Sequence, residues 1–112
     1  NGQGKTDTPE RLAQSQSIRN FMDTIRLPKI LCGDFNLRPE TESFKLIEQG
    51  MCNLVEKYQI PTTRTKLYSK CETEPFADYI LTCPNISINT FKVLPDVVSD
   101  HAPLFLDFGI SL

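Results

Sequence analysis

Residues 29–36 have the sequence KILCGDFN. An apolar run is followed at once by a glycine, a carboxylate, an aromatic ring and a carboxamide. Short apolar runs that end at turn-forming residues are typical of buried strands, and loops at strand ends are where proteins present functional side chains. We therefore expect a strand over residues 30–33 that holds Asp34 and Asn36 rigidly at its end.

Two later segments have a similar build. Asp78 precedes an apolar run over residues 79–83, and Asp100 and His101 are followed by the sequence APL. Neighbouring residues on a strand point to opposite faces, but Asp100 and His101 can point the same way on a turn closed by Pro103. Phosphoester hydrolysis needs a cation, a carboxylate that orients water, and donors aimed at the phosphoryl oxygens. Five residues supply most of that set: Asp34, Asn36, Asp78, Asp100 and His101.

These residues also have ordinary structural interpretations. An Asp-x-Asn sequence after a strand is a common turn and helix-start device, because short carboxylates and carboxamides cap backbone amides. His101 is the one histidine of the chain, and a single histidine is more often a surface or hydrogen-bonded residue than a catalyst. The order and spacing of all three segments, rather than any one of them, favour a single functional site.

The three segments resemble the endonuclease/exonuclease/phosphatase superfamily. They are GDFN at residues 33–36, DYI at residues 78–80 and SDHAPL at residues 99–104. The superfamily includes pancreatic-type deoxyribonucleases, exonuclease III-like repair nucleases, sphingomyelinases and inositol polyphosphate 5-phosphatases. Residues 4–12 are also similar to the segment that leads into a long helix in bacterial members. This combination is specific to the superfamily and not to any substrate.

The resemblance implies a role for each residue of the expected site. Asp34 would orient and activate the attacking water, Asn36 would bond a phosphate oxygen, and His101 would contact the scissile phosphate. Asp78 would accept a hydrogen bond from the other ring nitrogen of His101. Asp34 would bind the metal, and Asp100 would either bind it too or contact one of its ligands. These hard oxygen ligands suit Mg²⁺ or Mn²⁺.

The resemblance also implies a fold. It places residues 1–112 as the C-terminal part of the domain, an α/β chain forming the C-terminal half of a four-layer α/β sandwich. Its sheet is expected to be mixed but largely antiparallel, with helices on one face. Complete members carry an Asn ligand, a Glu ligand and a further catalytic His or Tyr upstream of the segment that residues 1–12 resemble. We therefore expect weak metal binding and negligible activity from the isolated chain.

Two classes of function follow from this interpretation. The first is a metal-dependent phosphoesterase, which hydrolyses phosphodiesters or phosphomonoesters by metal-assisted attack of water. The second is a noncatalytic remnant or interaction module. A half-domain with one sheet leaves an apolar face uncovered, so its expected partners are the missing N-terminal half or a second copy in a homodimer. A nucleic acid, a lipid and a small molecule all stay open as the phosphoester substrate.

Net charge and cysteine content indicate which partners and which cellular compartment to expect. A net charge of −2 and a pI near 5.3 argue against tight nonspecific binding to DNA. The basic run of Arg64, Lys66 and Lys70 is either a solvated hairpin or a loop that binds substrate phosphate, with Arg64 as the substrate-binding candidate. The four cysteines form no Cys-x-x-Cys pair, and no apolar run approaches the length of a membrane span. We expect a cytoplasmic protein in which Cys32, Cys52 and Cys83 are small buried apolar residues.

Local signals predict the order of the elements. A helix should begin at Thr8-Pro9, with Ile18, Phe21, Met22 and Ile25 at helical spacing, and end before Pro28. A second helix should run from Pro39 to Gly50 with Phe44 and Ile47 facing inward. The remaining predictions are a short strand over residues 53–56, a loop or hairpin over residues 60–70, and strands over residues 77–83, 86–94 and 104–108.

Overall fold

The computed structural model describes residues 6–70 and 72–110, which form an α/β structure with antiparallel sheets. Its elements, in chain order, are α1 (Pro9–Asp23), β1 (Ile30–Asp34), α2 (Glu42–Glu48), β2 (Cys52–Asn53), α3 (Leu54–Lys57), β3 (Asp78–Thr82), β4 (Ile86–Val93) and β5 (Leu104–Ile110). Within the described residues, no helix is both long enough and apolar enough to span a membrane.

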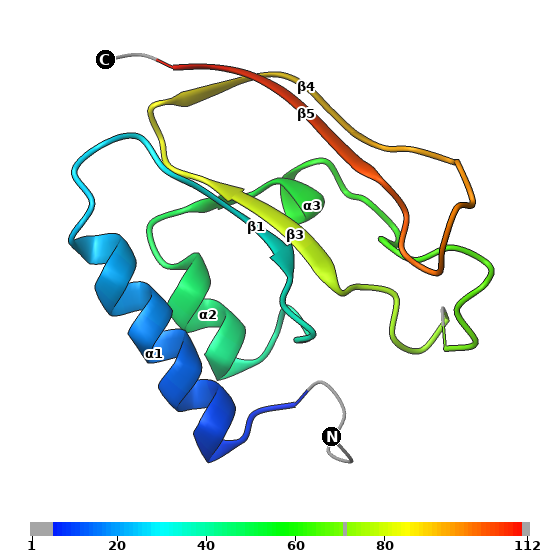
Figure 1. The fold of residues 1–112 in the computed structure, drawn as a ribbon, viewed down its shortest axis with the longest axis horizontal. Coiled ribbons are helices and arrows are strands. Elements are labelled where there is room, and N and C mark those ends of the chain that lie inside the picture. The colour runs from blue at the N-terminus through cyan, green and yellow to red at the C-terminus, as the bar shows by residue number, and fades with distance from the viewer. Residues whose placement is uncertain (1–5, 71, 111–112) are drawn as a thin grey trace.

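The strands form two separate sheets. One sheet has the order β1-β3-β2, and the other pairs β4 with β5. Every described pairing is antiparallel, so the expected largely antiparallel character is confirmed, whereas the expectation of one mixed sheet is wrong. Helices α1 and α2 pack together on one side of the three-stranded sheet, and the β4–β5 ribbon lies on the other side (Figure 1).

The core lies between the three-stranded sheet, α2, α3 and β4. Its buried members are Leu37, Phe44, Ile47, Leu54, Val55, Tyr79, Ile80, Leu81 and Phe91. The rings of Phe44 and Tyr79 have centroids 4.5 Å apart, and the ring of Phe35 stacks 5.6 Å from that of Tyr79. Burial of each such side chain contributes about 1.5–3 kcal/mol to the free energy of unfolding. This aromatic group lies directly behind the end of β1, so the core supports the loop that follows that strand.

Helix α1 starts as predicted, but of the apolar residues at helical spacing only Met22 is buried. Thr8 caps the helix by accepting a hydrogen bond from the backbone of Arg11, and Pro9 occupies the first turn. The buried residues are Ser15, Arg19 and Met22, whereas Phe21 is 67% exposed. The Arg19 guanidinium donates to backbone carbonyls at the end of α2. The contact with α2 is therefore largely polar, which the apolar spacing did not predict.

The segment around α2 and α3 confirms one prediction and overturns another. Helix α2 begins at Glu42 rather than Pro39, because the Thr41 hydroxyl accepts from Phe44 N and caps the helix there, and Phe44 is buried as predicted. Residues 53–56 were predicted as a strand, but only Asn53 belongs to one. The Asn53 carboxamide oxygen accepts from the next two free backbone amides and so starts helix α3.

The later strands β3, β4 and β5 lie where the sequence predicts them, and residues 60–70 form a loop. Strand β1 is correctly located but is not fully buried, because it forms an edge of its sheet. Cys32 on this strand is exposed, which corrects the expectation for it, while Cys83 is buried and Cys52 partly buried. Cys71 lies outside the described residues.

Candidate active site

Two carboxylates face each other across the strand pair β1–β3. The antiparallel register places Asp34 directly opposite Asp78. The pairing continues one step beyond β1, where Phe35 N donates to Ala77 O at 2.9 Å. Residues opposite each other in an antiparallel pair are held at a fixed separation. The backbone ladder therefore brings the two acids to one end of the three-stranded sheet.

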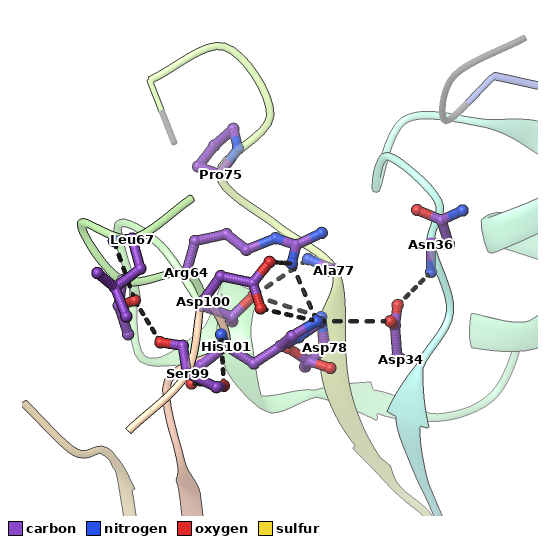
Figure 2. A network of polar contacts seen from close by, with 12 residues as sticks. Asp34, Asn36, Arg64, Leu67, Pro75, Ala77, Asp78, Ser99, Asp100 and His101 are labelled. Atoms are coloured by element: carbon purple, nitrogen blue, oxygen red, sulfur yellow. Dashed lines mark hydrogen bonds and ion pairs between the residues drawn. The ribbon is translucent and has the colours of Figure 1, made fainter. Parts of the chain in front are cut away.

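The GDFN segment has a distinct structural reason for each residue. Gly33 and Asn36 have φ values of 145° and 50°, a region in which glycine and asparagine are the favoured residues. Phe35 points into the aromatic group of the core, and by alternation Asp34 points outward with its side chain 48% exposed. Asp34 Oδ1 accepts from Asn36 N at 2.9 Å. The Asn36 carboxamide points away from the Asp34 carboxylate (Figure 2).

His101 reaches these carboxylates from the turn between β4 and β5. Its Nδ1 lies 2.7 Å from Asp78 Oδ2, so the predicted hydrogen bond is confirmed. Its backbone pairs with Arg64 as an isolated antiparallel bridge. On either side, Ala102 N donates to Thr63 O at 2.9 Å and Thr65 N donates to Asp100 O at 3.1 Å. The histidine turn is thus bound to the loop formed by residues 60–70.

Thr63 links that loop to the strands. It is fully buried, and its hydroxyl oxygen accepts from Ala77 N at 3.0 Å and from Asp78 N at 3.3 Å. The same residue's carbonyl accepts from the histidine turn, so Thr63 touches both sides of the site. Thr63 was not predicted to take part, because one threonine in a polar loop leaves no periodic signal of its burial.

Arg64 turns into the site, whereas Lys66 and Lys70 are exposed to solvent. Its Nη1 lies 3.0 Å from His101 Nε2, and Asp100 Oδ2 lies 3.7 Å from the same Nη1 (Figure 2). A guanidinium can only donate, so Nε2 of His101 accepts here and Nδ1 carries the proton donated to Asp78. Of the basic run, Arg64 therefore lies beside the site residues, whereas Lys66 and Lys70 lie on the solvated surface, and binding of substrate phosphate by Arg64 stays a prediction.

The oxygen atoms around His101 suit a hard divalent cation. Asp34 Oδ2 and Asp100 Oδ1 each lie 3.9 Å from His101 Nε2, and both side chains are about half exposed. Ligand atoms of Asp34, Asp78 and His101 also lie within 4.8 Å of one another. Asp78 holds His101 Nδ1 and its side chain is only 14% exposed, so Asp34 and Asp100 are the carboxylates that are more open to an added ion. Such exposed carboxylates are the ligands that Mg²⁺ and Mn²⁺ prefer.

The structure brings most of the predicted site together. Asp34, Asp78, Asp100, His101 and Arg64 converge, whereas Asn36 takes part through its backbone amide. Tyr68 was not predicted to take part, yet its ring lies 3.8 Å from the Arg64 guanidinium carbon.

A family model and curated relatives match this chain. The model of the Endonuclease/Exonuclease/phosphatase family matches residues 4–101. Nocturnin of Rattus norvegicus is 30% identical over 74 residues, which covers 58% of this chain and 17% of that protein. Nocturnin of Homo sapiens is 27% identical over 120 residues, covering 86% of this chain and 28% of that protein. The chain therefore spans less than a third of the length of these relatives.

Two solved structures share the fold. A mannosyl-6-phosphatase from Bacteroides thetaiotaomicron VPI-5482 superposes with a TM-score of 0.76 at 22% identity, covering 95% of this chain and 48% of that one. An endonuclease/exonuclease/phosphatase family protein from Bacteroides thetaiotaomicron gives a TM-score of 0.72 at 25% identity, covering 91% of this chain and 45% of that one. The likeness thus extends over about half of each solved chain.

Proposed function

Because the chain belongs to the endonuclease/exonuclease/phosphatase family, we propose that it supplies the C-terminal part of a phosphoesterase domain that cleaves its substrate by attack of water. The observation that carries this proposal is the arrangement around one imidazole. Asp78 holds Nδ1 of His101 at 2.7 Å, and Asp34 lies 3.9 Å from Nε2 on the other side of the ring. A base, an oriented imidazole and exposed carboxylates are the groups that water-dependent phosphoester cleavage requires.

Asp34 is the proposed group that orients the attacking water and accepts its proton. One of its oxygens is held by Asn36 N, which fixes the carboxylate, and the other faces His101. The exposed position gives water access to this oxygen. Strand pairing behind Asp34 keeps the carboxylate in place without help from a mobile side chain.

His101 is the proposed contact to the scissile phosphate. In the free protein its Nε2 accepts from Arg64. To donate to a phosphoryl oxygen, Nε2 must instead carry a proton, and the Asp78 carboxylate stabilises the imidazolium that results. Asn36 is the proposed donor to a second phosphoryl oxygen, a role that requires its carboxamide to rotate toward the site.

Asp34 and Asp100 are the residues that would hold Mg²⁺ or Mn²⁺, and such an ion supplies positive charge that offsets the charge of the phosphoryl oxygens. The acidic surroundings of His101 fit that requirement, since three carboxylates lie within 4 Å of its ring nitrogens. Phosphodiesters and phosphomonoesters both fit this chemistry, and nucleic acids, lipids and small molecules all stay candidates for the rest of the substrate.

Hydrolysis of p-nitrophenyl phosphate and bis(p-nitrophenyl) phosphate in Mg²⁺ or Mn²⁺ tests the proposal. The protein to assay is the whole product of the gene that encodes residues 1–112. We expect Asp34→Ala and His101→Ala each to lower kcat/KM by about 10²-fold or more. Asp107→Ala, on the exposed face of β5, is the control and should leave the rate unchanged. Undiminished turnover in both site variants would refute these roles.

An apolar groove favours a second candidate function, a self-associating interaction module. The groove has a volume of about 540 Å³ and lies between α1 and the start of β1. Ile18 and Phe21 line it and are 37% and 67% exposed. A second copy of the chain that covers this face would bury these side chains, as expected for a homodimer. Sedimentation of the 112-residue chain tests this candidate, and a folded monomer at high concentration would exclude it.

A further inference from the structure

Arg64 is a buried cation with unused hydrogen-bonding capacity. Its side chain is only 7% exposed, yet Nη1 makes a single hydrogen bond, to His101. Its Nε atom is buried and has no hydrogen-bond partner among the described residues. A guanidinium carries five N–H donors and keeps its charge, and buried donors are normally satisfied. Within the described residues, the guanidinium therefore has N–H donors to spare for a further acceptor.

The charge of Arg64 is only partly offset by its surroundings. Asp100 Oδ2 is 3.7 Å from Nη1, which is too long for a hydrogen bond. The other near neighbour of Nη1 is His101 Nε2, the atom that also lies 3.9 Å from Asp34. An anion placed at this point would contact the arginine and the histidine together. A phosphoryl group fits well, because two of its oxygens match the paired N–H groups of a guanidinium.

Tyr68 determines where the guanidinium lies. The turn in which Tyr68 N donates to Thr65 O at 3.0 Å places the tyrosine ring 3.8 Å from the guanidinium carbon. A cation stacked on a ring within about 6 Å is attracted by the face of that ring. Stacking uses the face of the guanidinium, whereas its N–H groups lie in the plane, where Nη1 reaches His101 Nε2. The ring can therefore hold Arg64 without consuming its donors.

We infer that Arg64 binds a phosphoryl oxygen of the substrate and that Tyr68 is a positioning residue, which keeps the guanidinium aimed at that oxygen. This inference rests on the proposed function for the identity of the anion. In the free protein Arg64 contacts Nε2 of His101, and the phosphoryl group takes over that contact when it binds. The lysines of the same loop, Lys66 and Lys70, have no part in it, because both are exposed.

Calorimetric titration with inorganic phosphate in the presence of Mg²⁺ tests the inference without requiring turnover. Arg64→Gln should weaken phosphate binding by about tenfold or more, as expected for the loss of a charged hydrogen bond. Arg64→Lys keeps the charge but loses the paired N–H groups. Its affinity for phosphate should therefore lie between those of the unsubstituted protein and Arg64→Gln. Lys66→Gln and Lys70→Gln remove the same charge from the same loop and should stay within about twofold of the unsubstituted protein.

Tyr68 variants separate positioning from folding. Tyr68→Leu should weaken phosphate binding by about threefold to fivefold, the size expected for a lost cation–π contact. Tyr68→Phe keeps the ring face and should restore binding to within about twofold. In a substrate assay, Tyr68→Leu should raise KM more than it lowers kcat. Circular dichroism checks that each variant is folded. Methyl phosphate and dimethyl phosphate, titrated in parallel, show whether a monoester or a diester is the better ligand.

The outcomes distinguish this inference from the proposed function. Phosphate binding that depends on Arg64, in a protein that hydrolyses no phosphoester, would support the inference and refute the function. Hydrolysis that requires Asp34 and His101 but is unaffected by Arg64→Gln, with phosphate affinity also unchanged, would overturn the inference alone. Equal losses in the two lysine variants, or no phosphate binding by the unsubstituted protein, would also overturn it.

Discussion

The candidate site has two halves that are held in different ways. Asp34 and Asp78 form the strand-held half, where a backbone ladder and an aromatic cluster fix both carboxylates. Arg64, Asp100 and His101 form the loop-held half, where single hydrogen bonds between two loops determine each position. Strand pairing therefore places Asp34 and Asp78, whereas the positions of Arg64, Asp100 and His101 depend on a few hydrogen bonds between loops.

The substitution with the largest expected effect removes core packing behind the strand-held half of the site. Phe44 is fully buried against Tyr79, directly behind the end of β1. Phe44→Ala should lower the free energy of unfolding by about 3–5 kcal/mol, because it leaves a cavity in the core. Phe105→Ala removes the same ring from a position that is 47% exposed, and should cost about 0.5 kcal/mol or less. Urea denaturation measures both, and equal losses would contradict this assignment of the core.

The substitution with the next largest effect removes the hydrogen bonds by which Thr63 connects the two halves. Thr63→Val keeps the shape of the side chain but leaves two backbone amides, of Ala77 and Asp78, without their acceptor. The free energy of unfolding should fall by about 1–3 kcal/mol, as expected when buried polar groups lose their hydrogen-bond partner. Thr63→Ser retains the hydroxyl and is the matched control. The imidazole resonances of His101 should shift in the valine variant and not in the serine variant, and no shift in either would show that Thr63 does not couple the halves.

A substitution with a smaller expected effect removes hydrogen bonds at the start of α2, the helix that packs behind the strand-held half. Asp7 accepts from the backbone of Glu42 and Ser43 and from the Ser43 hydroxyl. Asp7→Ala should therefore cost about 1 kcal/mol, the usual value for a lost cap, and should leave the imidazole resonances of His101 unchanged. In a Ser43→Ala background the cost should be smaller, because the two residues share hydrogen bonds.

The same carboxylate gives a pH dependence with a definite sign. The hydrogen bond from the Ser43 hydroxyl is the main reason that the pKa of Asp7 lies below its ordinary value of 3.8. The charged form is favoured in the folded state, so its stabilisation is present above pH 3.8 and is lost as the pH falls through the lowered pKa. The stability difference between the unsubstituted protein and Asp7→Ala should shrink over that range, and a constant difference would contradict it.

The smallest effect concerns Glu48 at the end of α2. Burial is the main reason that the pKa of Glu48 is raised above 4.5, although a hydrogen bond from Asn53 opposes it. The protonated form is favoured in the fold, so stability is full below pH 4.5 and falls as the pH rises through the raised pKa. Glu48→Gln should raise the free energy of unfolding by about 0.3 kcal/mol at pH 7. The gain is small because solvent screens most of the cost of burying the charged carboxylate. Glu42→Gln, which loses an ion pair with Lys45, should gain nothing.

Sequence alone determined the elements whose signals are local. The Asp78–His101 hydrogen bond was implied by the resemblance of the DYI and SDHAPL segments to the superfamily. The Thr8-Pro9 helix start, the inward Phe44 and the later strands follow from caps and periodicity. Each of these signals lies within a few neighbouring residues. Local interactions are strong enough there for the pattern to predict the structure.

Tertiary structure alone decided which polar residues of the loops are buried. Arg64 belongs to the site while Lys66 does not, Thr63 joins the two halves, and Cys32 lies on an exposed edge. Each outcome depends on partners far away along the chain, and the local sequence carries no trace of them. Burial of a polar side chain is favourable only when those distant partners complete its hydrogen bonds, so the packed structure rather than the sequence pattern decides it.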